Sequence, residues 1–214
     1  MSWLMAKLYD RVMRDTESAG LSGWRADLLG GVDGRVLELG VGTGVNLPFY
    51  TDAVEALILS EPDSNMRARL KARLDMKPDQ RIRISENAAE VLPFPDGHFD
   101  WVVSTLVLCS VSDPAQSLKE VYRVLRPGGG LVFIEHVCAK DRPDRYRWQR
   151  RIEPVWKWLA DGCHLTRDTA AFIEDAGFHM ASITRASMRK APPVIRPTIR
   201  GVARKPSQSG HLRN

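Results

Sequence analysis

The stretch Val36-Leu37-Glu38-Leu39-Gly40-Val41-Gly42-Thr43-Gly44 decides the fold of this 214-residue chain. Its first four residues are apolar except for Glu38, which is the pattern of a buried strand. The glycines that follow, Gly40, Gly42 and Gly44, allow the backbone to turn tightly and to come close to a ligand. The stretch therefore predicts a strand that ends in a ligand-binding loop.

The spacing of these glycines argues against two common nucleotide loops. A dinucleotide-binding loop has its third glycine three residues after the second and seats a pyrophosphate at a helix N-terminus, whereas Gly44 follows Gly42 after two. The Lys-Ser/Thr pair of a nucleoside-triphosphate loop is missing as well. Taken alone, the loop indicates only that the backbone approaches a nucleotide-like ligand.

Other segments accompany the loop in a fixed order. Glu61 ends the second expected strand, 17 residues after Gly44, where a carboxylate can accept hydrogen bonds from both hydroxyls of a ribose. Asn87 and Ala88 follow the third strand, and the segment 123–129, Arg-Val-Leu-Arg-Pro-Gly-Gly, leads into the fifth. This combination is far more specific than the glycines alone.

Strand-like apolar runs alternate with helical segments, and this order predicts a parallel sheet covered by helices on both faces. We predict an α/β fold with a Rossmann-like, doubly wound, mostly parallel sheet of seven strands and a C-terminal antiparallel hairpin. The expected strands are 35–39, 56–61, 82–86, 99–105, 130–136, 178–188 and 196–203. The expected helices are 3–20, 46–50, 64–74, 114–124, 141–161 and 167–176.

Length and composition are those of one globular domain, with 43% hydrophobic and 27% charged residues. We expect a single domain over 1–205, with an N-terminal helical cap (1–32), an amphipathic substrate-side insertion (141–166) and a disordered tail (206–214). No apolar stretch approaches the roughly 20 residues of a membrane span, and the N-terminus lacks the apolar core of a secretory signal. These features predict a cytoplasmic protein, with peripheral membrane contact as an alternative.

Charge and cysteine usage narrow the partners. Residues 140–214 carry 16 basic against 7 acidic side chains, which is typical of a solvated face more often than of an anionic partner. Cys109, Cys138 and Cys163 match neither a disulfide framework nor a paired-cysteine zinc site, and the five histidines are scattered. We therefore expect a small-molecule acceptor, no nucleic acid and no metal.

The ordered set of motifs resembles the class I S-adenosylmethionine-dependent methyltransferases over roughly residues 33–190. The resemblance implies S-adenosyl-L-methionine as the cofactor. It also implies contacts of Glu38 and the glycine loop with the methionine moiety, of Glu61 with the ribose, and of Asn87 and Ala88 with the adenine. The full set of expected cofactor-binding residues is Glu38, Gly40, Gly42, Thr43, Gly44, Asn46, Glu61, Pro62, Asn87, Ala88, Thr105 and Leu106.

Three blocks resemble more closely the methyltransferase-like thiol S-methyltransferases of animals. They are 37–50, 105–111 and the tryptophan-rich segment 148–167, which lies outside the shared cofactor core. That family methylates small, lipophilic thiols, so the resemblance implies S-methylation of a small, apolar thiol. Its animal members carry an N-terminal membrane anchor, whereas the N-terminus here has Lys7, Asp10 and Arg11 among its apolar residues.

The acceptor side is expected beyond the carboxyl ends of the fourth and fifth strands. His136 closes the fifth strand, and Asp161, Cys163 and His164 follow the tryptophan-rich helix; we predict His136, Asp161 and His164 as the catalytic residues. Because a thiol ionises near neutral pH, a strong base is optional. Trp148 and the neighbouring tryptophans could pack in the core, wall an acceptor pocket or contact a membrane. Packing in the core is the favoured alternative.

Several other functions compete with thiol methylation. Phospholipid N-methyltransferases and quinone C-methyltransferases share the core motifs, and a non-catalytic cofactor-binding module would keep the loop and Glu61. A nucleic-acid methyltransferase is disfavoured because the fourth strand ends in Ser104-Thr105-Leu106-Val107, without the Asn/Asp-Pro-Pro-aromatic motif. The glycine spacing and the terminal hairpin disfavour a nicotinamide-dependent reductase.

Overall fold

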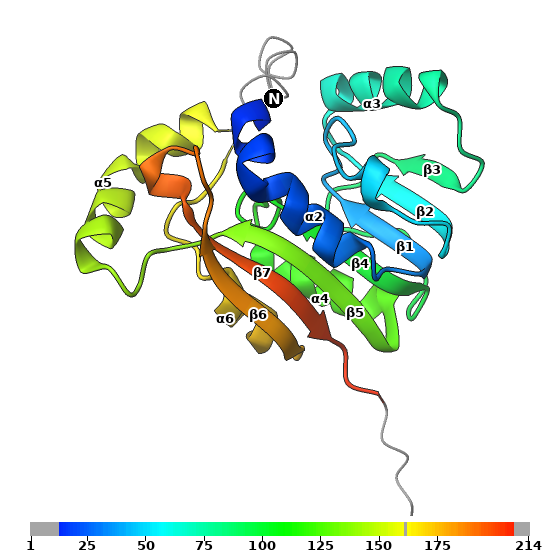
Figure 1. Ribbon diagram of the computed structural model, residues 1–214. Helices are drawn as coiled ribbons and strands as arrows, with labels where there is room; N and C mark the ends of the chain where they lie inside the picture. The colour runs from blue at the N-terminus through cyan, green and yellow to red at the C-terminus, as the bar shows by residue number, and fades with distance from the viewer. Residues whose placement is uncertain (1–12, 161, 208–214) are drawn as a thin grey trace, which may run out of the picture.

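A seven-stranded sheet in the order β3-β2-β1-β4-β5-β7-β6 forms the centre of the molecule in the computed structural model, which describes residues 13–160 and 162–207 (Figure 1). The five strands β1 to β5 pair with one another in parallel, whereas β7 runs antiparallel to β5 and to β6. The predicted fold class is therefore confirmed. The strands are β1 (Gly34–Leu39), β2 (Val54–Ser60), β3 (Ile82–Ser85), β4 (Phe99–Thr105), β5 (Leu125–His136), β6 (His179–Ser187) and β7 (Pro197–Arg204).

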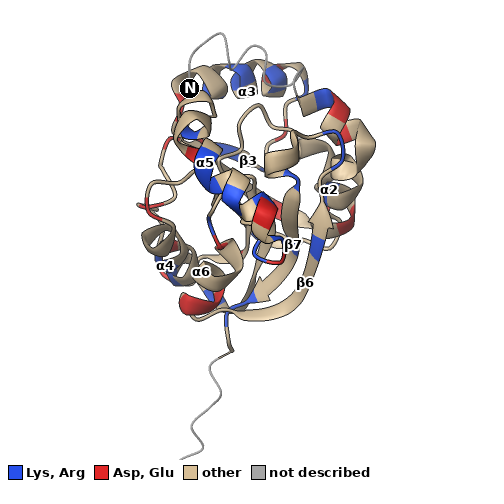
Figure 2. Ribbon diagram, turned by 90° about the vertical axis from the view of Figure 1, so that its left-hand side faces the viewer, with Lys and Arg blue, Asp and Glu red and all other residues tan. Residues whose placement is uncertain are grey.

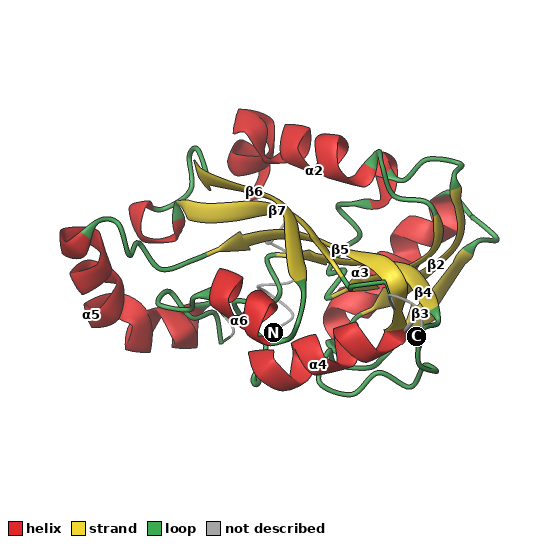
Figure 3. Cartoon of the chain, turned by 90° about the horizontal axis from the view of Figure 1, so that it is seen from below, coloured by secondary structure: helices red, strands yellow, loops and turns green. Residues whose placement is uncertain are grey.

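Helices cover both faces of this sheet, with α2 on one side and α4 and α6 on the other (Figure 3). Leu29 of α2 and Leu70 of α3 pack on one apolar cluster, and Leu118 of α4 and Ile173 of α6 pack on the other. The helices are α2 (Ser22–Leu29), α3 (Ser64–Met76), α4 (Pro114–Val124), α5 (Pro143–Leu159) and α6 (Thr169–Asp175), with the shorter η1 (Glu17–Leu21), η2 (Leu47–Phe49) and η3 (Pro193–Ile195).

Local signals fix the starts of two helices that follow the parallel strands. The side chain of Asp63 caps α3 by accepting from the backbone N–H groups of Asn65 and Met66. The side chain of Asp113 caps α4 in the same way, by accepting from the backbone N–H of Gln116. Pro114 lies in the first turn, where backbone N–H groups have no partner within the helix, so its missing N–H removes no hydrogen bond. Both helices consequently begin where the sequence predicts.

β5 begins at Leu125, five residues earlier than the predicted strand start at Gly130. Its first residues are the glycine-rich segment that directly follows α4. The pairing of β5 with β4 shifts in register between Phe99 and Trp101 of β4. A Cβ atom on Gly130 would lie 2.4 Å from the ring of Trp101, so this position requires glycine for packing and not only for turning.

Two sequence expectations about helical packing need correction. The predicted buried stripe of α5 is wrong, because Trp148, Val155 and Leu159 are exposed and Gln149 is the buried residue of this helix. Pro154 lies inside α5 without ending it. The helix expected over 3–20 falls mainly on residues 1–12, which lie outside the described part of the chain.

Candidate functional site

The glycine loop leaves the carboxyl end of β1 in a conformation that favours glycine. Gly40, Gly42 and Gly44 have φ values of 52°, 59° and 82°. A Cβ atom on Gly40 would lie 2.7 Å from Val107, and one on Gly44 would lie 2.7 Å from Leu47, whereas one on Gly42 would meet nothing within 4 Å. Gly42 is thus the point of the loop whose backbone is open to an approaching ligand.

Glu61 follows β2 directly and turns its carboxylate to this loop. Its Oε2 accepts from the backbone N–H of Gly42 at 2.8 Å, and its Oε1 accepts from that of Asp63 at 2.9 Å. The side chain is 7% exposed, and burial raises its pKa while the two backbone hydrogen bonds lower it. Glu61 therefore joins the loop to the end of β2, and each carboxylate oxygen retains capacity for a second hydrogen bond.

Glu38 is the buried acid of β1, one residue before the loop begins. Asn46 Nδ2 donates to its Oε1 at 2.9 Å, and the Tyr50 hydroxyl donates to its Oε2 at 2.7 Å. Burial, with a smaller contribution from the charge of nearby Glu61, raises the pKa of Glu38 to about 7. The two hydrogen bonds and the charge of Arg25 act in the opposite direction. This carboxyl group therefore changes charge near neutral pH.

Arg25 of α2 reaches across to this network, although no sequence pattern singled it out. It is 4% exposed and donates from one guanidinium nitrogen to Asn46 Oδ1 at 2.6 Å and to Thr105 Oγ1 at 3.0 Å. Its other nitrogens bind the carboxylate of Glu17, at 3.0 Å for the closest pair. The N-terminal helix is thereby tied to the ends of β1 and β4 by a buried charge.

The residues expected near an adenine lie at the next strand end. Asn87 follows β3; its side-chain oxygen accepts from Ser85 Oγ at 2.8 Å, and its backbone carbonyl accepts from Ser60 Oγ at 2.5 Å. Asn87 and Ala88 are half-buried, and Pro62 is exposed. The backbone at this edge is therefore fixed by hydroxyl groups of β2 and β3.

The end of β4 is strained and is held by a buried acid that the sequence analysis missed. Leu106 has a φ of 60°, which is unusual for a residue with a branched side chain. The fully buried carboxylate of Glu135, in β5, accepts from Ser104 Oγ and from the backbone N–H groups of Val107, Leu108 and Cys109 at 2.7 to 3.2 Å. Glu135 thus sets the course of the loop after β4.

Cys109, His136 and Cys163 form what we call the sulfur–imidazole cluster. Both cysteines are free thiols. Cys109, His136 and Cys163 are 1%, 3% and 8% exposed, respectively. His136 Nε2 lies 2.6 Å from Cys163 Sγ, and Trp156 Nε1 donates to the same sulfur at 3.3 Å. A hydrogen bond from Cys109, followed by the hydrogen bond and the charge of His136, lowers the pKa of the Cys163 thiol to about 4, although burial opposes this.

Of the two predicted catalytic residues that the structure describes, one lies in this cluster. His136 belongs to it, whereas His164 Nδ1 lies 3.4 Å from Glu153 Oε1 of α5. Burial and the nearby charges of Arg167 and Lys157 lower the pKa of His164. Asp161 lies outside the described residues. Cys109 escaped the sequence analysis because nothing in the sequence indicates that it meets residues 27 and 54 positions away.

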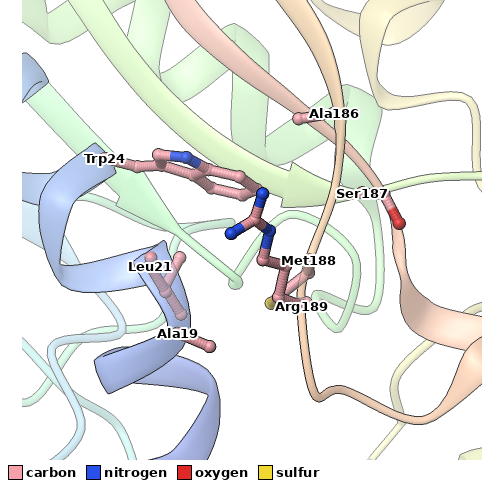
Figure 4. Close-up of a pocket in the computed structure, with 8 residues that line it drawn as sticks. Ala19, Leu21, Trp24, Ala186, Ser187, Met188 and Arg189 are labelled. Atoms are coloured by element: carbon pink, nitrogen blue, oxygen red, sulfur yellow. The ribbon is translucent and has the colours of Figure 1, made fainter.

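A cavity of about 320 Å³ lies between the N-terminal helices and the end of β6 (Figure 4). Leu21 and Trp24 line it from the helical side, and Ser187, Met188 and Arg189 from the other side. None of the predicted cofactor-binding or catalytic residues lines it. Leu21 also packs in the same apolar cluster as Ile134 of β5 and Leu106, the residue that follows β4.

Comparison with known proteins supplies the family. A methyltransferase-domain family matches residues 37–133. Mammalian thiol S-methyltransferases are 36 to 43% identical, and the chain spans 59 to 69% of their length. The human thiol S-methyltransferase TMT1A is 36% identical over 169 residues, which cover 78% of this chain and 69% of that protein.

Two further relatives show how widely the similarity extends. Phosphatidylethanolamine N-methyltransferase of Cereibacter sphaeroides is 37% identical over 113 residues, which cover 51% of this chain and 54% of that protein. The crystal structure of an S-adenosylmethionine-dependent methyltransferase from Mesorhizobium loti matches with a TM-score of 0.63 at 25% identity, and covers 87% of this chain and 97% of that one. The chain therefore belongs to the class I S-adenosylmethionine-dependent methyltransferases, and S-adenosylmethionine is its cofactor.

Proposed function

We propose that this enzyme transfers a methyl group to the sulfur of a small, apolar thiol. The observation that carries the proposal is the similarity to thiol S-methyltransferases, which extends through α5 and beyond the shared methyltransferase domain: the matched relatives cover up to 78% of the chain, whereas the domain ends at residue 133. The segment outside the domain is the part that follows β5 on the acceptor side of the sheet.

The residues present fit the cofactor. We assign the open backbone of Gly42 and the carboxylate of Glu38 to the methionine moiety, whose ammonium group is positively charged. Glu61, with free acceptor capacity beside the loop, suits the two ribose hydroxyls. Asn87 and Ala88 suit the adenine, with Pro62 beside them, and Thr105 and Leu106 suit the side facing the acceptor. Gly40, Thr43, Gly44 and Asn46 maintain the loop and its buried network.

When bound, S-adenosylmethionine supplies an electrophilic methyl group on a sulfonium. The main task of the chain is then to align an acceptor in line with that methyl at near-contact distance, because orientation alone can supply several kcal/mol of barrier reduction. The strained Leu106 and the Glu135-held loop after β4 keep that side of the site rigid. This rigidity supports alignment as the principal catalytic device.

A thiol acceptor loses its proton more readily than an amine or a hydroxyl, because a thiol with a pKa of about 8.5 is partly ionised at neutral pH. Among our candidates we retain His136 next to the acceptor. Its Nδ1 is buried without a hydrogen-bond partner among the described residues, and a bound acceptor would supply one. His164, which is oriented by Glu153, and Asp161 stay candidates for the rim of the site.

Methyl transfer to matched acceptors tests the proposal. We expect turnover with small alkyl and aryl thiols and little with the alcohols of the same carbon skeleton, because oxygen stays protonated where sulfur ionises. Product should be followed as the thioether by mass spectrometry. Turnover confined to phospholipid vesicles or to quinones, with none on free thiols, would overturn thiol methylation in favour of the corresponding lipid or quinone methylation.

The exposed surface of α5 favours a membrane-associated acceptor as the second candidate. Trp148, Val155, Trp158 and Leu159 are 53 to 83% exposed. Arg147, Arg150, Arg151 and Lys157 are exposed on the same helix, and Figure 2 shows basic residues along it. Apolar and basic side chains on one surface helix suit an anionic lipid surface. Among the described residues, no helix has both the length and the apolar character of a membrane span.

We therefore propose that α5 rests on anionic lipid headgroups. Co-sedimentation with vesicles should show binding to phosphatidylglycerol-rich vesicles and weak binding to pure phosphatidylcholine. Replacing both Trp148 and Trp158 with alanine should reduce the bound fraction, since both indole rings are exposed. Equal binding of the two proteins, or equal binding to both kinds of vesicle, would rule out this surface.

A further inference from the structure

The sulfur–imidazole cluster has the composition of a metal site. Cys109 lies in the loop after β4, His136 is the last residue of β5, and Cys163 follows α5, so three separate segments converge. One donor atom from each lies within 4.8 Å of the others. Within the described part of the chain, these are the residues whose histidine, cysteine and acidic donor atoms gather in this way. Tertiary folding alone has placed two sulfurs and an imidazole together.

The surroundings of the cluster hold its members in place. Glu135 accepts from the Cys109 backbone N–H, and the backbone N–H of His164 donates to the Cys109 carbonyl at 2.8 Å. Arg167 donates to the carbonyls of Leu108 and Val111, on either side of Cys109. Trp156 donates to the Cys163 sulfur. Hydrogen bonds that orient the ligand residues in this way accompany metal sites and tune the basicity of the ligands.

An ordinary pair of buried thiols accounts for the cluster less well. A buried thiol normally sits in apolar surroundings, whereas here Cys163 Sγ, in a residue 8% exposed, lies against the His136 imidazole and accepts from the Trp156 indole N–H. A divalent cation bound here would hold both sulfurs as thiolates, because it neutralises the charge that ionisation of a buried thiol creates.

We propose that Cys109 Sγ, His136 Nε2 and Cys163 Sγ bind a zinc ion and leave a fourth position open. Two thiolates and one imidazole suit zinc, and a site with three protein ligands keeps a position for water or an external ligand. Calcium and magnesium require oxygen ligands, which the cluster does not offer. The site lies beyond the carboxyl ends of β4 and β5, the edge at which open α/β sheets bind their ligands.

Metal binding requires one local adjustment. Zinc–ligand bonds of about 2.3 Å to sulfur and about 2.0 to 2.1 Å to nitrogen, at tetrahedral angles, separate sulfur from nitrogen by about 3.6 Å. The present separation between His136 Nε2 and Cys163 Sγ is 2.6 Å. The imidazole and the sulfur therefore move about 1 Å apart when the ion enters. No backbone element of the sheet has to shift for a side-chain movement of this size.

The test measures metal binding on the whole protein without cofactor or acceptor. After purification under reducing conditions and dialysis against trace zinc, we expect about one zinc per chain by mass spectrometry of the metal. Cys109→Ser, His136→Gln and Cys163→Ser should each weaken zinc binding by at least about 100-fold in competition with a chelating dye, because each removes a ligand. Cys138→Ser is the matched control, since Cys138 is also buried and free but lies outside the cluster.

Cobalt(II) substitution keeps the proposal testable even if a variant fails to fold. The wild-type protein should show sulfur-to-cobalt charge-transfer absorption at one equivalent, and addition of a small thiol should change that spectrum through the open position. An absence of zinc and of charge-transfer absorption in the reduced wild-type protein would overturn the site, as would a Cys109–Cys163 disulfide in that same sample. An unchanged spectrum on adding thiol would overturn the open position. These readouts do not depend on methyl transfer, so they are independent of the proposed function.

Discussion

The cofactor side and the acceptor side of the site differ in how their polar groups are held. On the cofactor side, Glu38, Asn46, Thr105 and Arg25 form one closed hydrogen-bonded network, and Glu61 is held by backbone N–H groups. On the proposed acceptor side, His136 Nδ1 is buried without a hydrogen-bond partner among the described residues, and the pKa of the Cys163 thiol is lowered by Cys109 and His136. Among the described residues, the polar groups on the proposed cofactor side are therefore paired within the chain, whereas one ring nitrogen on the proposed acceptor side is not.

This difference predicts the largest effect at Glu61. Glu61→Ala should weaken S-adenosylmethionine binding by about 100-fold or more, because charge-assisted hydrogen bonds contribute roughly 1.5 to 3 kcal/mol each. Isothermal titration calorimetry measures this directly. Glu86→Ala is the control, since its side chain is 68% exposed and pairs with Arg67. A loss of less than about threefold for Glu61→Ala would contradict its assignment to the ribose.

Arg25 tests whether the N-terminal helix belongs to the closed network. Arg25→Ala removes the Arg25 donor from Asn46 Oδ1 and leaves the Glu17 carboxylate with the hydroxyl of Ser22 in place of the guanidinium. We expect the free energy of unfolding to fall by about 2 to 3 kcal/mol in urea titrations. Arg35→Ala should cost less than about 1 kcal/mol, because Arg35 is 48% exposed and lies 4.0 Å from Asp100. Equal effects of the two substitutions would mean that the network contributes little.

The pH dependence of cofactor binding reports on Glu38. With a pKa of about 7, this carboxyl group is mostly protonated at pH 6 and mostly ionised at pH 8. If the ionised form binds the positively charged methionine moiety, affinity should rise by about tenfold between these pH values. Glu38→Gln should bind more weakly and lose this dependence. The same dependence in both proteins would assign the titration to another group.

The same shift has the opposite consequence for stability. Since the pKa of Glu38 is higher in the folded protein, the unfolded chain loses its proton first as the pH rises. The contribution of Glu38 to the free energy of unfolding is therefore full at low pH and declines between about pH 4.5 and pH 7. Glu38→Gln should remove this decline in denaturant titrations.

The smallest effect is expected on the exposed face of α5. Trp158→Ala should change the free energy of unfolding by no more than about 0.5 kcal/mol, because the ring is 83% exposed. Gln149→Ala, on the same helix, should cost about 1 to 3 kcal/mol, because this buried amide bonds the backbone of Val137, Ala139 and Val194. A large loss for Trp158→Ala would mean that the indole packs against the protein.

Much of the fold could be predicted because its signals are local. The strand at Val36, the helices that begin at Ser64 and Pro114 and the glycine loop each depend on a few neighbouring residues, and the structure has these elements within a few positions of the predicted bounds. The predicted start of β5 is five residues too late. Glycine and proline usually end a strand, but in β5 these residues belong to the strand, and Gly130 packs against the ring of Trp101. Periodicity identified α5 but misjudged which of its faces is buried, since periodicity does not say what lies opposite.

By itself the sequence determined the succession of strands and helices along the chain, the mostly parallel sheet, the glycine loop and the two acids, Glu38 and Glu61, that stand at fixed spacing around it. Only the tertiary structure decided that Arg25 joins the cofactor network, that Glu135 holds the loop after β4, and that Cys109 and Cys163 meet at His136. The physical reason is distance along the chain. Capping, turning and strand alternation act between neighbours, whereas a buried ion pair or a three-residue cluster forms only after the sheet has brought its strand ends together.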